Sequence, residues 1–144
     1  MYETILLATD GSSDADAALD HAVELASANR GTLHIVSVVE TRTAYDNAII
    51  DPEDVRDNLR KDAREAVDGA KSAAVDAGID CDADVLEGAP PDRILEYAEG
   101  IGADLIVVGA TGRSGFKRLI LGGTAEQLLE SSSVPVAVLG GGRD

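Results

Sequence analysis

The glycine-rich stretch Gly109-Ala-Thr-Gly112-Arg-Ser-Gly-Phe-Lys-Arg-Leu-Ile-Leu-Gly122-Gly123-Thr124 is the most informative part of this chain. It follows an apolar run, Asp104 to Val108, that is typical of a buried strand, and it leads into a helix-forming segment, Ala125 to Leu129. A glycine-rich loop between a strand and a helix exposes backbone N–H groups, and the helix N-terminus adds a partial positive charge. The stretch therefore predicts an anion site suited to phosphate.

Outward from this stretch, strand and helix patterns alternate along the chain. The predicted strands are Ile5 to Ala8, Leu33 to Val39, Asp80 to Glu87, Ala103 to Val108 and Val134 to Leu139. The predicted helices run from Ser12 or Ser13 to Gly31, from Pro52 to Gly78, after the turn Gly88-Ala-Pro-Pro91, and after Gly123. Residues Glu40 to Asp51 form the longest predicted loop, and Gly140 to Asp144 a frayed tail. Strands separated by helices predict a single α/β domain over residues 1–144, a parallel sheet with helices on both faces.

The strand order is predicted from the two strands whose residues suit an edge position in the sheet. Asp80 to Glu87 alternates acidic and apolar residues, as a half-exposed edge strand does, and Pro135 favours an edge because proline lacks a backbone N–H. Placing these two strands outermost gives the order 3-2-1-4-5. In such sheets a ligand binds beyond the carboxyl ends of the strands where the winding direction reverses, here between the first and fourth strands. Thr9 and Asp10 are therefore expected opposite Gly109.

Charge and composition limit the partners. The 144-residue chain carries 27 acidic and 12 basic residues, a formal net charge of −15, which disfavours nucleic acids and anionic membranes. The acidic residues are spread along the chain, so we hypothesise a protein adapted to high cytosolic salt, where screening weakens self-repulsion; the alternative is an ordinary acidic protein. No signal peptide or membrane-spanning run is visible, so we expect a cytoplasmic location.

The remaining chemistry-bearing residues predict no catalytic or metal site. Cys81 is the only cysteine and alternates inward with Ala83 and Val85, as a small core residue does. His21 and His34 have no metal-ligand spacing to one another or to Cys81. The patterns of a P-loop, a dinucleotide-binding turn, a receiver domain and a nucleophile elbow are missing.

With these features the chain resembles the ATP-binding universal stress proteins, whose signature is G-x2-G-x9-G followed by Ser or Thr. Gly109, Gly112 and Gly122 reproduce the glycine spacing. The resemblance covers essentially the whole chain, including Ile5-Leu-Leu-Ala-Thr-Asp10 and Val134-Pro-Val-Ala-Val. It implies a five-stranded Rossmann-like fold of the adenine nucleotide alpha hydrolase type that binds ATP, with or without Mg²⁺, and acts as a stress-response or signalling module.

The resemblance also implies roles for individual residues. Asp10, after Thr9, matches an aspartate near the adenosine, and Val38 matches a residue whose backbone meets the adenine edge. Gly109 and Gly112 match the turn over ribose and phosphates, while Arg113 and Ser114 match positions from which side chains reach phosphate oxygens. The full set implied for the nucleotide is Thr9, Asp10, Val38, Gly109, Gly112, Arg113, Ser114, Gly122, Gly123 and Thr124.

One signature position differs, because Gly123 stands where the family has Ser or Thr, and Thr124 follows one place later. A hydrogen bond to a charged group contributes about 1.5–3 kcal/mol, so losing the hydroxyl would weaken binding by about 10- to 150-fold unless Thr124 supplies it. Structural readings also stay open: the glycines suit a tight turn, and Asp10 suits a helix cap. Arg113, Lys117 and Arg118 nevertheless gather positive charge in an acidic chain, which favours an anion.

Two functional classes remain. The first is a nucleotide-binding module that signals through a dimer or a partner protein; the second is a family member that has lost the nucleotide and acts by protein contacts alone. Neither reading needs catalysis, since no convincing base for water is visible, and we expect at most slow, incidental ATP hydrolysis. The apolar strand Val134 to Leu139 would expose backbone donors and acceptors at an edge, which predicts a homodimer through this strand, as the family resemblance also implies.

Overall fold

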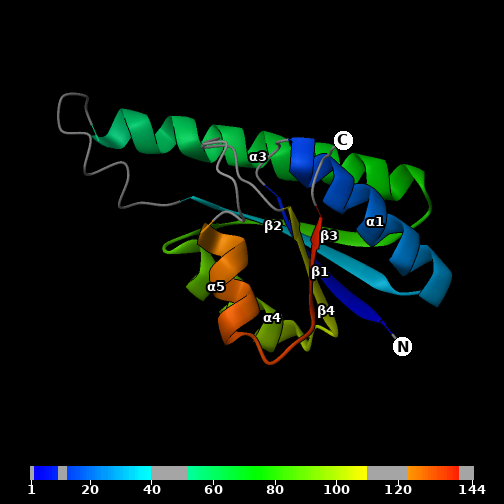
Figure 1. Ribbon diagram of the computed structural model, residues 1–144. Helices are drawn as coiled ribbons and strands as arrows, with labels where there is room; N and C mark the ends of the chain where they lie inside the picture. Colours follow the sequence, from blue (N-terminus) through cyan, green and yellow to red (C-terminus); the bar gives the residue numbers. More distant parts are fainter. Residues whose placement is uncertain (1, 10–12, 40–51, 110–122, 140–144) are drawn as a thin grey trace.

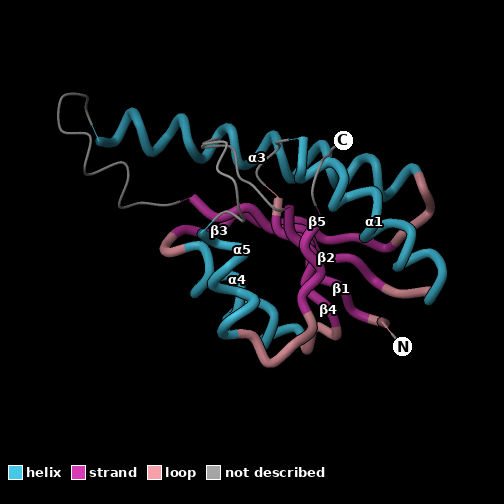
Figure 2. Tube along the Cα trace, in the orientation of Figure 1, coloured by secondary structure: helices cyan, strands magenta, loops and turns pink. Residues whose placement is uncertain are grey.

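A computed structural model describes residues 2–9, 13–39, 52–109 and 123–139. The elements are β1 (Thr4–Ala8), α1 (Ser13–Asn29), β2 (Thr32–Val39), α3 (Pro52–Asp76), β3 (Asp80–Glu87), α4 (Pro90–Ile101), β4 (Leu105–Gly109), α5 (Gly123–Ser131) and β5 (Val136–Leu139). The five strands form one parallel sheet in the order β3-β2-β1-β4-β5, which confirms the predicted topology. Helices α1 and α3 cover one face of the sheet, and α4 and α5 the other (Figures 1 and 2).

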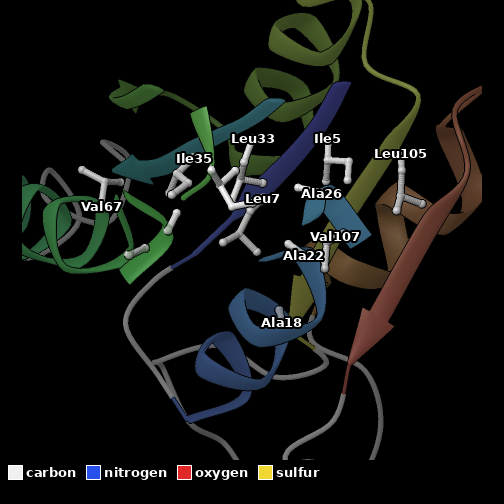
Figure 3. Close-up of a cluster of buried hydrophobic side chains, with 13 residues drawn as sticks. Ile5, Leu7, Ala18, Ala22, Ala26, Leu33, Ile35, Val67, Leu105 and Val107 are labelled. Carbon is white, nitrogen blue, oxygen red and sulfur yellow. The ribbon is translucent and has the colours of Figure 1, made fainter. Parts of the chain in front are cut away.

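The core consists of two layers, one on each face of the sheet. Side chains of β1, β2 and β4 alternate between the layers, so Leu7 packs toward α1 and α3 while Leu6 packs toward α4 and α5. Figure 3 shows the first layer, where Ala18, Ala22 and Ala26 of α1 face the sheet. Small alanines on a helix let its axis approach the sheet closely, which explains how a chain with 3% aromatic residues fills its core.

The edge strand β3 behaves as its alternation predicts. Cys81, Ala83 and Val85 pack against the layer under α1 and α3, whereas Asp82 and Asp84 are exposed on the opposite face. Burial raises the pKa of the Cys81 thiol, against a smaller lowering by Lys71 and with a small further rise from Asp82. The cysteine is thus a half-buried packing residue whose thiolate is disfavoured.

Five strand boundaries differ from the prediction by one or two residues. Three are strand starts: β1 begins at Thr4 rather than Ile5, β2 at Thr32 rather than Leu33, and β4 at Leu105 rather than Ala103. Gly109 is the last residue of β4, paired with Leu139, rather than the first residue of the loop. The fifth strand begins at Val136 rather than at Val134, although the carbonyl of Pro135 still accepts the N–H of Ile106 at 2.9 Å. Proline contributes only an acceptor, so it lies just before the ladder. The predicted loop Glu40 to Asp51 and tail Gly140 to Asp144 lie outside the described residues.

Three helices end in a residue with a left-handed backbone conformation. At the end of α1 this residue differs from the glycine that the sequence suggests. Gly78 and Gly102 have positive φ angles of 82° and 66°, as expected of glycine just after a helix. At the end of α1 this position is held by Arg30, with φ 54°, and not by Gly31. Gly31 is needed for a different reason: an added Cβ would lie 2.7 Å from the carbonyl oxygen of Tyr2.

Asp104 forms hydrogen bonds at the amino end of the sheet. Its carboxylate Oδ2 accepts the backbone N–H groups of Glu3 and Thr4, each at 3.0 Å. Its own backbone N–H donates to the carbonyl oxygen of Thr4 at 2.7 Å. One aspartate just before β4 therefore holds the entry into β1. Among the described residues, no helix combines the length and apolarity needed to cross a bilayer.

Candidate functional site

The carboxyl ends of β1 and β4 meet at the centre of the sheet. Ala8 pairs with Val108, so the next residues, Thr9 and Gly109, leave the two neighbouring strands at the same level. Thr9 is 9% exposed, and its backbone N–H donates to the carbonyl oxygen of Val36 at 2.9 Å. The winding direction reverses between these strands, since β1 is followed by β2 on one side and β4 by β5 on the other. Thr9 and Gly109 thus lie at the switch point where α/β sheets bind ligands.

Val38 extends this edge by one strand. It is half-buried, lies two residues beyond the partner of Ala8 on β2, and pairs in register with Leu86 of β3. Both side chains pack in the core layer under α4 and α5. Beyond them, the N–H of Gly88 donates to the carbonyl oxygen of Val39 at 3.0 Å. The carboxyl edge therefore runs from Gly109 through Thr9 and Val38 to Gly88.

Helix α5 begins at this same edge. The chain leaves β4 at its carboxyl end and enters β5 at Val136, at the amino end of the sheet, so α5 has to run back across it (Figure 1). Gly123 is its first residue and Thr124 its second. The helix is anchored by Ala125 and Leu128, which are 3% and 0% exposed. The first turn of α5, which has no intrahelical acceptors for its backbone N–H groups, therefore lies at the edge where an anion is predicted.

The structure thus brings five of the ten predicted site residues to one edge: Thr9, Val38, Gly109, Gly123 and Thr124. The other five, Asp10, Gly112, Arg113, Ser114 and Gly122, lie outside the described residues.

Sequence reasoning missed Arg93, which lies in the first turn of α4 at the outer end of this edge. A Cβ built on Gly88 would lie 3.1 Å from Cγ, Cδ and Nε of Arg93, so the arginine stem covers this glycine. Gly88 has φ 136°, a conformation that favours glycine. The available signal was a basic residue directly after the turn Gly88-Ala-Pro-Pro91, in a chain where such residues are few.

A second basic residue near this edge is engaged in an ion pair. Arg60 of α3 contacts the carboxylate of Glu87, the last residue of β3, through Nε and Nη2. This pair joins α3 to the carboxyl end of the sheet on the face opposite α4. Within the part of the chain that the structure describes, Arg93 is then the basic residue on the α4 side of the carboxyl end of β3.

His34 of β2 and Tyr97 of α4 form a ring contact away from the carboxyl edge. The rings of His34 and Tyr97 meet edge to face with centroids 6.2 Å apart. Burial raises the pKa of the Tyr97 hydroxyl, and the carboxylates of Asp84 and Asp82 raise it further. Within residues 2–9, 13–39, 52–109 and 123–139, no three His, Cys, Asp or Glu side chains cluster as a metal site requires.

Comparisons with known proteins agree with this architecture. Residues 1–140 match the model of the universal stress protein family. The chain is 32% identical over 140 residues to a universal stress protein of Methanocaldococcus jannaschii, covering 96% of this chain and 82% of that one.

Solved structures give the same result. The universal stress protein UspA of Lactobacillus plantarum superposes with a TM-score of 0.83 at 26% identity, over 96% of this chain and 97% of its own. A universal stress protein solved in complex with cAMP superposes with a TM-score of 0.69 at 28% identity, over 97% of this chain and 98% of its own. With the family model spanning nearly every residue, this chain belongs to the universal stress protein family.

Proposed function

We propose that this protein binds an adenine nucleotide, with ATP as the first candidate, at the carboxyl edge of the sheet between β1 and β4. The observation that carries the proposal is the register of Ala8 with Val108, because it puts Thr9 and Gly109 side by side at the switch point. A related protein of 28% identity was solved with cAMP, an adenine nucleotide, which supports the same ligand class here.

The residues present suit such a ligand. A nucleotide brings anionic oxygens and base nitrogens that accept hydrogen bonds, and this edge offers donors for both. The start of α5 at Gly123 supplies backbone N–H groups for phosphate, with Mg²⁺ as a natural companion of the phosphates. The buried Nε of Arg93 has no hydrogen-bond partner among the residues that the structure describes, so it suits a ligand that supplies an acceptor.

We propose that nucleotide occupancy, rather than turnover, is the functional event in a stress-response or signalling role. Among the described residues of this edge, Thr9, Val38 and Gly109 carry no carboxylate or imidazole, and the carboxylate of Glu87 is paired with Arg60. Hydrolysis, where it occurs, would be slow and incidental. The output would then depend on how an occupied site alters a dimer or a partner protein.

The nucleotide proposal is tested on the purified protein in molar KCl. Denaturing the protein should release ATP or a related adenine nucleotide, identified by chromatography and mass spectrometry. Stripped protein should rebind ATP in calorimetric titration, performed with and without Mg²⁺ to separate the contribution of the metal. A protein that is purified empty and does not bind Mg-ATP would contradict the proposal and favour the second class, a member acting by protein contacts alone.

The residue that favours the second class is Gly123, because it lacks the hydroxyl of the family signature. Gly123→Ser should tighten ATP binding by about 10- to 150-fold if the missing hydrogen bond to phosphate limits affinity. An unchanged dissociation constant would show that Thr124 or the backbone already fulfils this role. Thr124→Val in the wild-type background distinguishes Thr124 from the backbone, because removing the Thr124 hydroxyl weakens ATP binding only if that hydroxyl contacts the phosphate.

We also propose that the protein is a homodimer joined through β5. All four residues of β5 are half-buried, and its apolar side chains pack against both core layers. The other edge strand, β3, carries exposed carboxylates at Asp80, Asp82 and Asp84, a device that discourages strand pairing. Light scattering in high salt should give twice the 14.9 kDa chain mass; a monomer would refute this assembly.

A further inference from the structure

The Nε–H of Arg93 is a donor that the described part of the fold does not use. The side chain as a whole is 41% exposed, but its Nε atom is buried and has no hydrogen-bond partner among the described residues, whereas its Nη2 pairs with Glu96 Oε2 at 3.0 Å. Buried polar groups in folded proteins are nearly always satisfied, by protein, water or ligand. A guanidinium can place its terminal nitrogens in solvent, but the Nε–H held against Gly88 needs an acceptor that enters the site.

The position of Arg93 indicates which part of a ligand would reach it. Its stem covers Gly88, and the N–H of Gly88 is bonded to Val39, one residue beyond Val38. Its helical neighbour Ile94 packs in the same core layer as Val38. Arg93 therefore lies at the outer end of the carboxyl edge, by β2 and β3, while α5 follows β4 in the chain and contacts β5 as well as α4.

A nucleotide spanning this edge has two unlike ends. Its phosphates suit the α5 end, where the first turn of the helix presents backbone N–H groups, so its base extends toward the ends of β2 and β3. A purine base has no anionic oxygen but carries ring nitrogens that accept hydrogen bonds in its plane. An arginine N–H is a suitable donor for such a nitrogen.

We propose, on the basis of the proposed nucleotide function, that Arg93 is a specificity-determining residue that donates its Nε–H to a ring nitrogen of the bound purine. This hydrogen bond would satisfy the donor and fix the base in one orientation. If Arg93 served only to cover Gly88 and pair with Glu96, the identity of the base nitrogens would make no difference to it.

The experiment measures whether the effect of replacing Arg93 on ATP affinity depends on one ring nitrogen of the purine. Dissociation constants for ATP and for 1-deaza-, 3-deaza- and 7-deaza-ATP are measured by calorimetry on wild type, Arg93→Met and Arg64→Met. Methionine keeps an unbranched stem over Gly88 and removes the donor. Arg64 is an exposed residue of α3 paired only loosely with Asp68 at 3.7 Å, so Arg64→Met controls for the same loss of positive charge. Scanning calorimetry verifies that each variant folds.

Wild type should bind one deaza analogue about tenfold or more weakly than ATP, the loss expected for a hydrogen bond from a charged donor. Arg93→Met should bind ATP and that analogue equally, while Arg64→Met keeps the wild-type discrimination. If Arg93→Met discriminates among the analogues as wild type does, the role of Arg93 is overturned while the nucleotide function stands. A wild-type protein that binds none of the four ligands overturns both.

Discussion

At the scale of single residues, Asp104 links two strands that are far apart in the sequence. Its carboxylate accepts from Glu3 and Thr4, and its backbone N–H donates to Thr4, so three hydrogen bonds converge on one position. The N–H of Thr4 is part-buried, which makes the loss of its acceptor costly. Asp104 therefore stabilises the entry into the central strand, and this role depends on its side chain.

We predict that Asp104→Ala lowers the free energy of unfolding by about 1–3 kcal/mol, because it leaves two backbone donors without their acceptor. Asp104→Asn should cost less, since the amide oxygen can still accept. Urea unfolding monitored by circular dichroism measures both. Asp80→Ala, an exposed position on β3 with the same charge change, is the control and should leave the midpoint nearly unchanged in molar KCl, where its repulsion with Asp82 is screened.

Cys81 gives a pH-dependent prediction. Burial raises the pKa of its thiol above the ordinary value of 9.0, so the folded protein retains this proton at a pH where the unfolded chain has lost it. Alkylation by iodoacetamide should therefore titrate above pH 9.0 in the native protein and shift downward in urea. The same difference means that the contribution of Cys81 to stability is present at neutral pH and declines as pH rises through that region. A native alkylation profile centred below 9.0 would contradict this.

At the scale of elements, the ends of the helices show where sequence prediction succeeded and where it stopped. Gly78 after α3 was predicted from its spacing alone, because a residue just past a helix adopts a local conformation that glycine favours. Gly31 marks the predicted end of α1, yet the left-handed residue there is Arg30, and the constraint on Gly31 is the close approach of the Tyr2 carbonyl oxygen. That contact joins segments distant in the sequence, so no local pattern could reveal it.

We predict that Arg30→Gly stabilises the protein by about 0.5–1 kcal/mol. The change relieves a left-handed conformation that costs a non-glycine residue about 1–2 kcal/mol, less the extra chain entropy of glycine. Unfolding is measured in molar KCl so that the lost positive charge is screened. Gly102→Ala, at the equivalent position after α4, is the converse control and should destabilise the protein. Loss of stability in Arg30→Gly would mean that its side chain contributes more than the strain removes.

The candidate site was predictable to a similar extent. The meeting of Thr9 and Gly109 followed from strand order, since the ends of adjacent parallel strands share an edge. Arg93 was not predictable, because its relevance depends on a side chain covering Gly88 and on a nitrogen left without a partner. The sequence identifies a residue as basic, but only the packed structure shows whether its side chain has a hydrogen-bond or ion-pair partner.

At the scale of the whole molecule, the net charge of −15 opposes compactness. The exposed Asp80, Asp82 and Asp84 point to the same face of β3, and like charges so arranged repel. Adaptation to high salt, proposed from composition, predicts that the repulsion is relieved when the Debye length falls to about 3 Å in 1 M salt.

We therefore expect the melting temperature to rise from low to molar KCl. Asp82→Asn should raise the melting temperature at low salt and reduce the slope of its salt dependence, because it removes the central charge of the three. Asp104→Asn makes the same charge change at a hydrogen-bonded position and should not raise the melting temperature. A flat or falling curve for wild type would show that the acidic surface is not an adaptation to salt.

The central position of β1 has a consequence for how the chain is made. This strand is synthesised before the other four strands of the sheet, yet it pairs with β4 on one side, and the carboxylate that accepts hydrogen bonds at its start is that of Asp104. Until residues 104–109 leave the ribosome, β1 can pair only with β2, and its other side stays without a neighbouring strand. Vectorial synthesis thus postpones closure of the sheet, and with it the carboxyl edge where Thr9 meets Gly109, until most of the chain has been translated.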